Sequence, residues 1–218
     1  MSRPVIVVVG AGPGVSGSVA RRFADEGYDV ALLGQDQQVL DDLGPGLEER
    51  GASVGHCVAD VTDEQAARDA VRRFGEHAGR IDVLHFNPSA FRAKDPLTLT
   101  VGELLEDVAL GVGALLTAVQ AARPYMSQGA RVSVTGSVAA EDPWEGAASL
   151  GVQKAGVRNL VHSLDKRLAP DGIRAVSVTV HGALAREGAF TPDRVAESIW
   201  AAVARDESQW TSEVHHRG

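Results

Sequence analysis

Short apolar runs rich in valine and isoleucine alternate with helical patterns along the chain, and this alternation restricts the fold more than any other feature. Runs without polar alternation are typical of strands covered on both faces, as in parallel sheets. We predict strands at Val5–Val9, Asp29–Leu33, Ser53–Val58, Ile81–Phe86, Ala130–Thr135 and Ile173–Val180, and a more weakly patterned edge strand near Gln209–Val214. The intervening helices are predicted at Val15–Glu26, Gln37–Arg50, Asp63–Ala78, Val101–Ser127 and Ser149–Leu168, with a last helix starting at Thr191-Pro192.

Right-handed crossovers between such strands produce a doubly wound α/β fold with helices on both faces of a parallel sheet. The first strand ends in the turn Gly10-Ala11-Gly12-Pro13-Gly14-Val15-Ser16-Gly17. One register of this turn spells G-x-G-x-x-G from Gly12, whereas the other starts at Gly10 and has Ser16 in place of its last glycine. We prefer the second register because the strand ends at Val9. In either register backbone N–H groups and a helix N-terminus would bind a pyrophosphate; the alternative is a βα turn that binds nothing.

Composition argues against several other functions. The formal net charge of −8 argues against nucleic acid or an anionic membrane as a partner. No apolar run reaches the roughly 20 residues that a membrane span needs. The lone cysteine, Cys57, excludes an intramolecular disulfide and offers no metal-ligand spacing, so no metal site is predicted. We therefore expect a single domain over residues 1–218 in the cytoplasm.

Polar residues after the later strands carry a resemblance to a known family. In order they are Asp60-Val61, Asn87-Pro88-Ser89-Ala90, Ser137 and Lys154. From about Val5 to about Gly182 the chain resembles the short-chain dehydrogenase/reductase family, which implies a Rossmann-type fold that binds NAD or NADP. The resemblance implies that Asp60 binds the adenine, that Ser137 orients the substrate and that Lys154 holds the nicotinamide ribose. Its implied cofactor-binding residues are Gly10, Gly12, Pro13, Gly14, Val15, Gln35, Asp60, Val61, Asn87, Pro88, Ser89, Lys154 and Gly182.

Each of these matches also has a structural alternative. Asp60 would cap a loop, Ser137 would be a turn residue, and Lys154 would be a solvated charge on a helix. The second strand ends in Leu33-Gly34-Gln35-Asp36, so glycine stands where an acid would bind the ribose of NAD, and glutamine where arginine would bind the phosphate of NADP. Asp36 lies one residue late but would still reach the ribose and disfavour NADP. Neither cofactor is specified.

The chain departs from the family where the family delivers a proton. Leu150 stands in place of the tyrosine four residues before Lys154, and Ala109 in place of the helix asparagine. The chain's tyrosines, Tyr28 and Tyr125, are predicted to lie elsewhere. His181 is our substitute donor because imidazole titrates near neutral pH, although it could merely cap a strand. The predicted catalytic residues are Ser137, Lys154 and His181, with Ser137 and a water as the next donor and His85 as a core histidine with a backbone partner.

The predicted substrate side is open. Few residues separate Gly182 from Thr191, where the family has a longer helical excursion, so a reduced lid is expected unless a neighbouring subunit or the loop 141–146, with Trp144, covers the site. The sequence therefore predicts an oxidoreductase on a small-molecule carbonyl or alcohol, with an unusual proton donor. The alternatives are a non-redox dinucleotide-binding sensor or partner subunit, and a lyase or cyclase on the same scaffold. Family helix pairing predicts a homodimer or homotetramer, with close approach at Gly111, Gly113, Ala114, Ala155 and Gly156.

Overall fold

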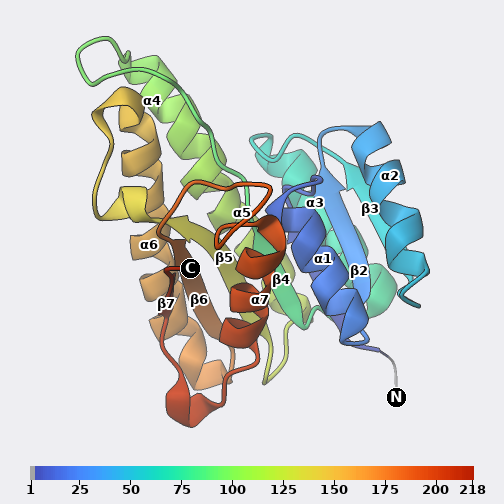
Figure 1. The fold of residues 1–218 in the computed structure, drawn as a ribbon. Helices are drawn as coiled ribbons and strands as arrows, with labels where there is room; N and C mark the ends of the chain where they lie inside the picture. The colour runs from blue at the N-terminus through green and yellow to red at the C-terminus, as the bar shows by residue number, and fades with distance from the viewer. Residues whose placement is uncertain (1–2) are drawn as a thin grey trace.

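A computed structural model of the protein describes residues 3–218. Within these residues seven strands form one parallel sheet in the order β3-β2-β1-β4-β5-β6-β7 (Figure 1). The chain winds outward from β1 in both directions, which is the doubly wound Rossmann-type arrangement predicted from the sequence. The strands are β1 Val5–Val9, β2 Asp29–Gly34, β3 Val54–Val58, β4 Val83–Phe86, β5 Arg131–Ser137, β6 Arg174–Val180 and β7 Glu213–His216.

Helices cover both faces of this sheet (Figure 1). The side chains of Val7 and Val9 belong to one core cluster, and those of Ile6 and Val8 belong to the other, because successive residues of a strand point to opposite faces. This is why β1 is apolar throughout rather than alternating, whereas β3, at one edge of the sheet, has exposed Gly55 and His56. The helices are α1 Val15–Asp25, α2 Gln37–Glu48, α3 Glu64–Ala78, α4 Val101–Val108, α5 Ala114–Ala122, α6 Ala148–Leu168 and α7 Pro192–Val203.

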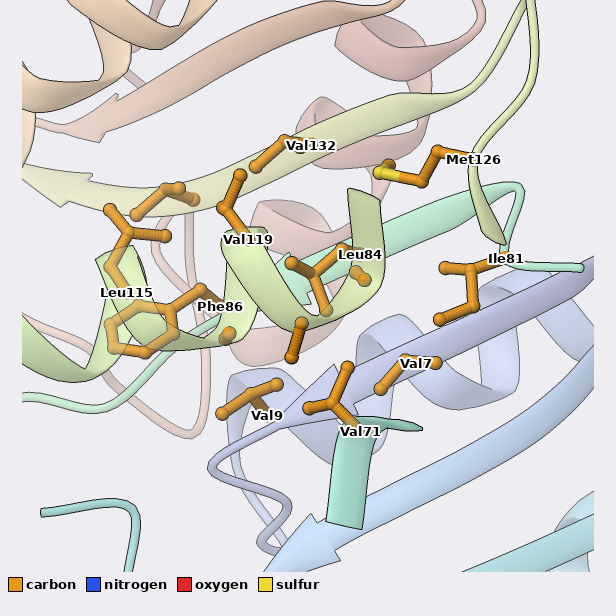
Figure 2. Packing of buried hydrophobic residues seen from close by; sticks show 14 of the residues in the cluster. Val7, Val9, Val71, Ile81, Leu84, Phe86, Leu115, Val119, Met126 and Val132 are labelled. Carbon is orange, nitrogen blue, oxygen red and sulfur yellow. The ribbon is translucent and has the colours of Figure 1, made fainter. Parts of the chain in front are cut away.

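The larger core cluster lies between the sheet and helices α3, α5 and α6. Figure 2 shows its centre, where side chains from β1, β4 and β5 meet those of α3 and α5. Phe86 and Leu115 are fully buried there. The opposite cluster packs α1, α2 and α7 on the other face of the sheet. Strand ends at the carboxyl edge of the sheet are held in place by both clusters.

The predicted helix Val101–Ser127 is interrupted. A π-helical segment, Ala109–Gly113, separates α4 from α5, and a 3-10 turn, Arg123–Tyr125, ends the run. By length and composition the segment Val101–Tyr125 would suffice to cross a membrane, so the expectation that no such run exists is wrong. Within its most apolar 18 residues, 44% are buried inside the protein. The apolar side chains of α5 belong to the core cluster on the sheet, as expected for a core helix.

The C-terminal edge strand lies later than predicted. β7 spans Glu213–His216, whereas residues 207–209 form a 3-10 turn. The reason is Trp210, whose indole N–H donates to Asp165 Oδ1 at 3.1 Å. The guanidinium groups of Arg131 and Arg174 lie over the same ring, at 4.8 and 5.1 Å from its centroid. These contacts hold Trp210 beside the sheet, and pairing with β6 begins only after it.

Candidate dinucleotide and catalytic site

The carboxyl ends of the parallel strands place the predicted site residues along one edge of the sheet. Val9 is paired with Phe86, so Gly10 follows β1 where Asn87 follows β4, and the Asn87 N–H donates to Val9 O at 3.0 Å. On the other side of β4, β5 ends at Ser137, whose register partner is Val180 at the end of β6. Turn residues from β1, β4, β5 and β6 therefore share this edge.

The turn after β1 requires glycine at its first position. Gly10 has φ +80°, and a Cβ on it would lie 2.8 Å from the ring of Pro88. Ser16 is buried, and its hydroxyl donates to Gly10 O at 2.7 Å. A Cβ on Gly17 would lie 2.8 Å from Gly12 O, so the glycines of both registers matter for close packing. Ser16 occupies the position of the third glycine in the preferred register. Its side chain stabilises the turn through the hydrogen bond to Gly10 O.

The middle of the turn forms an open cradle. A Cβ on Gly12 or Gly14 would meet no atom within 4 Å. Pro13 and Gly14 are exposed, Val15 is buried, and α1 begins at Val15 with no side-chain cap bond from Gly14. The first N–H groups of a helix lack intrahelical partners and attract anions. This backbone fits the pyrophosphate of a dinucleotide.

The turn after β2 has little room for a side chain. A Cβ on Gly34 would lie 3.0 Å from both Ala11 O and a Leu40 methyl carbon, which accounts for glycine where an acid was expected. Gln35 is exposed and lies close enough to the Asp60 side chain to help lower the pKa of that carboxyl. Asp36 caps α2, because its Oδ1 accepts from the N–H groups of residues 38 and 39. A contact of this exposed carboxylate with a ribose stays a prediction.

The loops after β3 and β4 hold the expected adenine and cofactor-lining residues. Asp60 is exposed and accepts bonds from Thr62 N–H and Thr62 Oγ1 at 2.8 and 2.7 Å, and these bonds lower the pKa of its carboxyl. It therefore caps the loop while it also faces solvent. The Val61 side chain is buried in the core, which leaves its backbone for any contact with a cofactor. Asn87 and Pro88 are half-buried, and Ser89 is exposed.

Gln153, which sequence reasoning missed, fixes the loop after β4. It is fully buried, its Oε1 accepts from Ala90 N–H at 3.1 Å, and its Nε2 donates to Ala90 O at 2.9 Å. Ser89 Oγ donates to the same Oε1 at 3.3 Å. A Cβ on Gly111 would lie 2.6 Å from Oε1, so the π-helical segment makes room for this amide. Ser149, Lys154 and Asp165 are also buried polar residues of α6, so no local pattern in the sequence singled out Gln153.

Lys154 is a buried cation rather than a solvated helix charge. It is 6% exposed, and its Nζ donates to Thr135 O at 2.9 Å, two residues before Ser137. Burial lowers the pKa of Lys154 to about 8. Leu150 lies one helical turn earlier on α6, half-buried, and Ala109 is exposed at the start of the π-helical segment. The end of β5 is therefore in contact with a buried amine whose pKa lies near neutral pH.

Ser137 and His181 end the neighbouring strands β5 and β6. Ser137 is half-buried, and its Oγ accepts from Ala139 N–H at 3.2 Å. His181 is also half-buried, with its Nε2 2.8 Å from Nδ1 of His215. Burial, with Arg217 and His215 nearby, lowers the pKa of His181. Its imidazole is therefore biased toward the neutral form.

His85 is a core histidine, but its partners differ from those expected. The ring is fully buried in β4, with Nδ1 2.9 Å from Ser133 Oγ and Nε2 3.5 Å from Thr135 Oγ1. These partners are side-chain hydroxyls of β5, not backbone groups. Burial lowers the pKa of His85 to about 3, so the ring is neutral. Its place within the strand keeps it away from the carboxyl edge.

The substrate side of this edge is bordered by short loops. In the described part of the chain, residues 182–191 form no helix before α7. A Cβ on Gly182 would lie 2.6 Å from the ring of Phe190, so this loop folds tightly on itself. In the loop after β5, Trp144 is 55% exposed and stacks on Phe91 with ring centroids 6.4 Å apart.

Comparisons with known proteins give a consistent result. Residues 4–185 match the family model described as short chain dehydrogenase. Over 178 residues the chain is 28% identical to sulfoacetaldehyde reductase 2 of Chromohalobacter salexigens, covering 80% of this chain and 70% of that protein. A short chain dehydrogenase from Burkholderia cenocepacia, solved in complex with NADP, has TM-score 0.89 and 26% identity, with 100% of this chain and 96% of that one covered. A dehydrogenase/reductase from Sinorhizobium meliloti shares the fold, with TM-score 0.91 and 22% identity over 99% of this chain and 94% of that one.

Proposed function

The chain belongs to the short-chain dehydrogenase family, and from that premise we propose that it is an NAD(P)-dependent oxidoreductase of a small carbonyl or alcohol that delivers its proton without a tyrosine. The observation that carries this proposal is Lys154, buried at the end of β5 with its pKa lowered to about 8. A buried ammonium group is unfavourable for folding, so its retention at the carboxyl edge of the sheet, which also carries the open turn after β1, supports a role in binding and catalysis.

Residues of this chain can be assigned to each part of the dinucleotide. The backbone from Gly10 to Val15 would hold the pyrophosphate, and Asp60 with Gln35 would face the adenosine. The loop from Asn87 to Ser89, fixed by Gln153, and the amine of Lys154 would line the nicotinamide ribose, with Gly182 on the opposite side. When bound, the nicotinamide supplies or accepts the hydride. The chain's own task is to place the carbonyl carbon against it and to supply a proton to the oxygen.

We assign proton delivery to the two titratable groups at this edge. Ser137 would orient the substrate oxygen through its hydroxyl. Lys154, with a pKa of about 8, is mainly protonated at neutral pH yet releases its proton far more easily than an ordinary lysine. His181 is the second donor, although it is already bonded to His215 and is biased toward the neutral form. A positioned acid contributes about 10²–10⁴-fold to such a rate, so the enzyme can be slow and still be an enzyme.

The first experiment measures single-turnover and steady-state oxidation of NADH and NADPH with a panel of small aldehydes and ketones. The panel includes a sulfonated aldehyde because a relative is named a sulfoacetaldehyde reductase. Lys154→Ala should lose turnover, whereas Lys166→Ala, an exposed lysine on the same helix, should keep it. Absence of hydride transfer from either cofactor across the panel would contradict the proposed activity.

The pH dependence distinguishes the two donors. With Lys154 as donor, reduction falls as pH rises through about 8, and His181→Ala retains that profile. With His181 as donor, reduction falls at lower pH because the pKa of that imidazole is lowered, and His181→Ala loses both rate and profile. Calorimetry with NAD, NADH, NADP and NADPH then settles the cofactor, which the turn after β2 does not specify.

We also propose that the protein forms a homodimer or homotetramer. Gly111 and Gly156 pack within the chain, against Gln153 and Val112, so they are occupied by internal contacts. Gly113 and Ala155 remain exposed, as do the apolar side chains of Val101, Leu105, Leu116 and Val152 on the same helices. Size-exclusion chromatography with light scattering gives the subunit number, and a monomer at micromolar concentration would contradict this assembly.

A further inference from the structure

Three side chains with metal-binding atoms meet near the end of the candidate site. Glu141 follows the short 3-10 turn after Ser137, His181 follows β6, and His215 lies in β7. Their ligand atoms all lie within 4.8 Å of one another, and Nε2 of His181 is 2.8 Å from Nδ1 of His215. We propose that Glu141, His181 and His215 bind a divalent metal ion of the zinc type.

The ligand set suits such an ion. Zinc binds imidazole nitrogen and carboxylate oxygen, in a set of two histidines and one glutamate that leaves a position for water. With metal–ligand bonds of about 2.0–2.2 Å, ligand atoms around a tetrahedral ion lie about 3.3 Å apart. The two ring nitrogens need to separate by about half an ångström, and both rings need to turn so that their lone pairs meet at the ion. Glu141 would exchange its contact with Arg158, at 3.3 Å, for the metal.

The backbone holds both histidines in place. The His181 N–H donates to His216 O at 2.9 Å, and His215 is paired with Thr179 in the β6–β7 register. The facing rings therefore come from two hydrogen-bonded strands, as a preformed metal site requires. The same arrangement explains why residue spacing in the sequence did not indicate the site, because 34 residues separate the two histidines.

The protonation state also favours a metal. Two imidazole nitrogens at 2.8 Å are bridged by one proton when no ion is present, and a metal ion replaces it. Glu141 and Glu213 both pair with Arg158, at 3.3 and 2.8 Å, and Arg217 lies close enough to affect His181. The charges of these two glutamates and two arginines cancel. The affinity for a metal ion therefore depends on the three ligand groups and not on a net charge around them.

Metal binding would join the loop after β5 to the ends of β6 and β7. It would also occupy the imidazole nitrogen of His181, leaving Lys154 as the available proton donor. The proposed site itself does not depend on any redox activity, and its test measures binding directly.

The experiment uses the full-length protein after chelator treatment. Calorimetric titration with Zn²⁺ should give one ion per chain, and Co²⁺ should give the intense visible absorption of a four-coordinate site. His181→Ala and His215→Ala should each weaken binding at least about tenfold, since even the loss of an outer partner of a metal ligand costs about 10–100-fold. His77→Ala, an exposed histidine on α3, is the matched control and should bind like the wild type.

Thermal unfolding separates loss of the site from loss of the fold. Zn²⁺ should raise the midpoint of the wild type, because an ion that binds the native state stabilises it, and should not raise that of either ligand variant. Both variants should keep the metal-free midpoint of the wild type within a few degrees; if one does not, His215→Gln serves in its place. Absence of Zn²⁺ binding, or binding that survives both histidine substitutions, would overturn the proposal.

Discussion

Replacing Lys154 by methionine should make the protein more stable at neutral pH while abolishing its activity. Lys154 is 6% exposed and donates to a backbone carbonyl rather than to a carboxylate, so its charge is buried without a countercharge. Methionine keeps the length of the side chain and removes the ammonium group. The substitution therefore tests directly whether the burial of this charge is unfavourable for folding.

The size of the effect follows from the shift in pKa. A fall from 10.5 to about 8 corresponds to about 3 kcal/mol of unfavourable free energy for the charged form in the folded state. Methionine also leaves Thr135 O without its donor, which costs about 1–3 kcal/mol, and a net stabilisation of about 1 kcal/mol is expected. For a chain of this size that raises the thermal midpoint by about 2–4 °C.

The pH dependence is the sharper measurement. In the wild type the unfavourable term is fully present below about pH 8 and disappears as pH rises toward 10.5, because between these values the unfolded chain binds more protons than the folded one. Urea unfolding from pH 7 to 10 should show this rise in the free energy of unfolding for the wild type and for Lys166→Met, the exposed control on α6, but not for Lys154→Met. A Lys154→Met protein that is destabilised at pH 7 and keeps the wild-type pH slope would refute the reasoning.

Other substitutions test the turn and the sheet edge. Gly12→Val should weaken dinucleotide binding in calorimetry at least tenfold with an unchanged thermal midpoint, since its Cβ meets no atom within 4 Å; unchanged affinity would exclude the cradle. Gly10→Ala should cost about 1–3 kcal/mol in urea unfolding because of its φ of +80° and the contact with Pro88; a neutral effect would contradict the close approach. Asp165→Asn should cost about 3 kcal/mol because Arg174 loses its buried partner. The lowered pKa of Asp165 means that this contribution is present above about pH 4 and is lost as pH falls through the folded value, which acid titration of both proteins would show.

Most of the fold was predictable because the central strands of the sheet are mostly apolar and are covered on both faces. Val5–Val9 matched its predicted bounds, and Thr191 caps α7 with Pro192 as the first helical residue, as the sequence indicated. The π-helical segment at Ala109–Gly113 was not predictable, since a single widened turn hardly changes the apolar period of a long helix. β7 was placed wrongly because the aromatic and apolar pattern near Trp210 reflects a cation-π contact and not strand pairing.

Some residues of the candidate site could also be predicted from the sequence, and others could not. Residues that follow a strand directly, such as Gly10 and Ser137, could be placed from sequence because parallel strands end at one edge. Gln153 on α6 and His215 on β7 could not be placed in this way. Their partners, Ala90 and His181, are far from them in the sequence, and no local pattern encodes such contacts. Asp36 has a local role that the sequence analysis did not include. An aspartate just before a helix satisfies the free N–H groups of the first turn, and that bond is available without any ligand.

The stability of the fold bears on the function. A leucine at position 150 adds an apolar side chain one helical turn from Lys154 and offers its amine no hydrogen bond, so this helix face does nothing to ease the burial of that charge. Core packing alone would favour methionine or leucine at position 154, since a buried unpaired cation is unfavourable for folding. The chain instead keeps the lysine, aligns it with Thr135 O and rigidifies the adjacent loop through Gln153. Such an arrangement is explained by a ligand that uses the amine, and the open backbone cradle at Gly12 and Gly14 is where the phosphates of that ligand would lie.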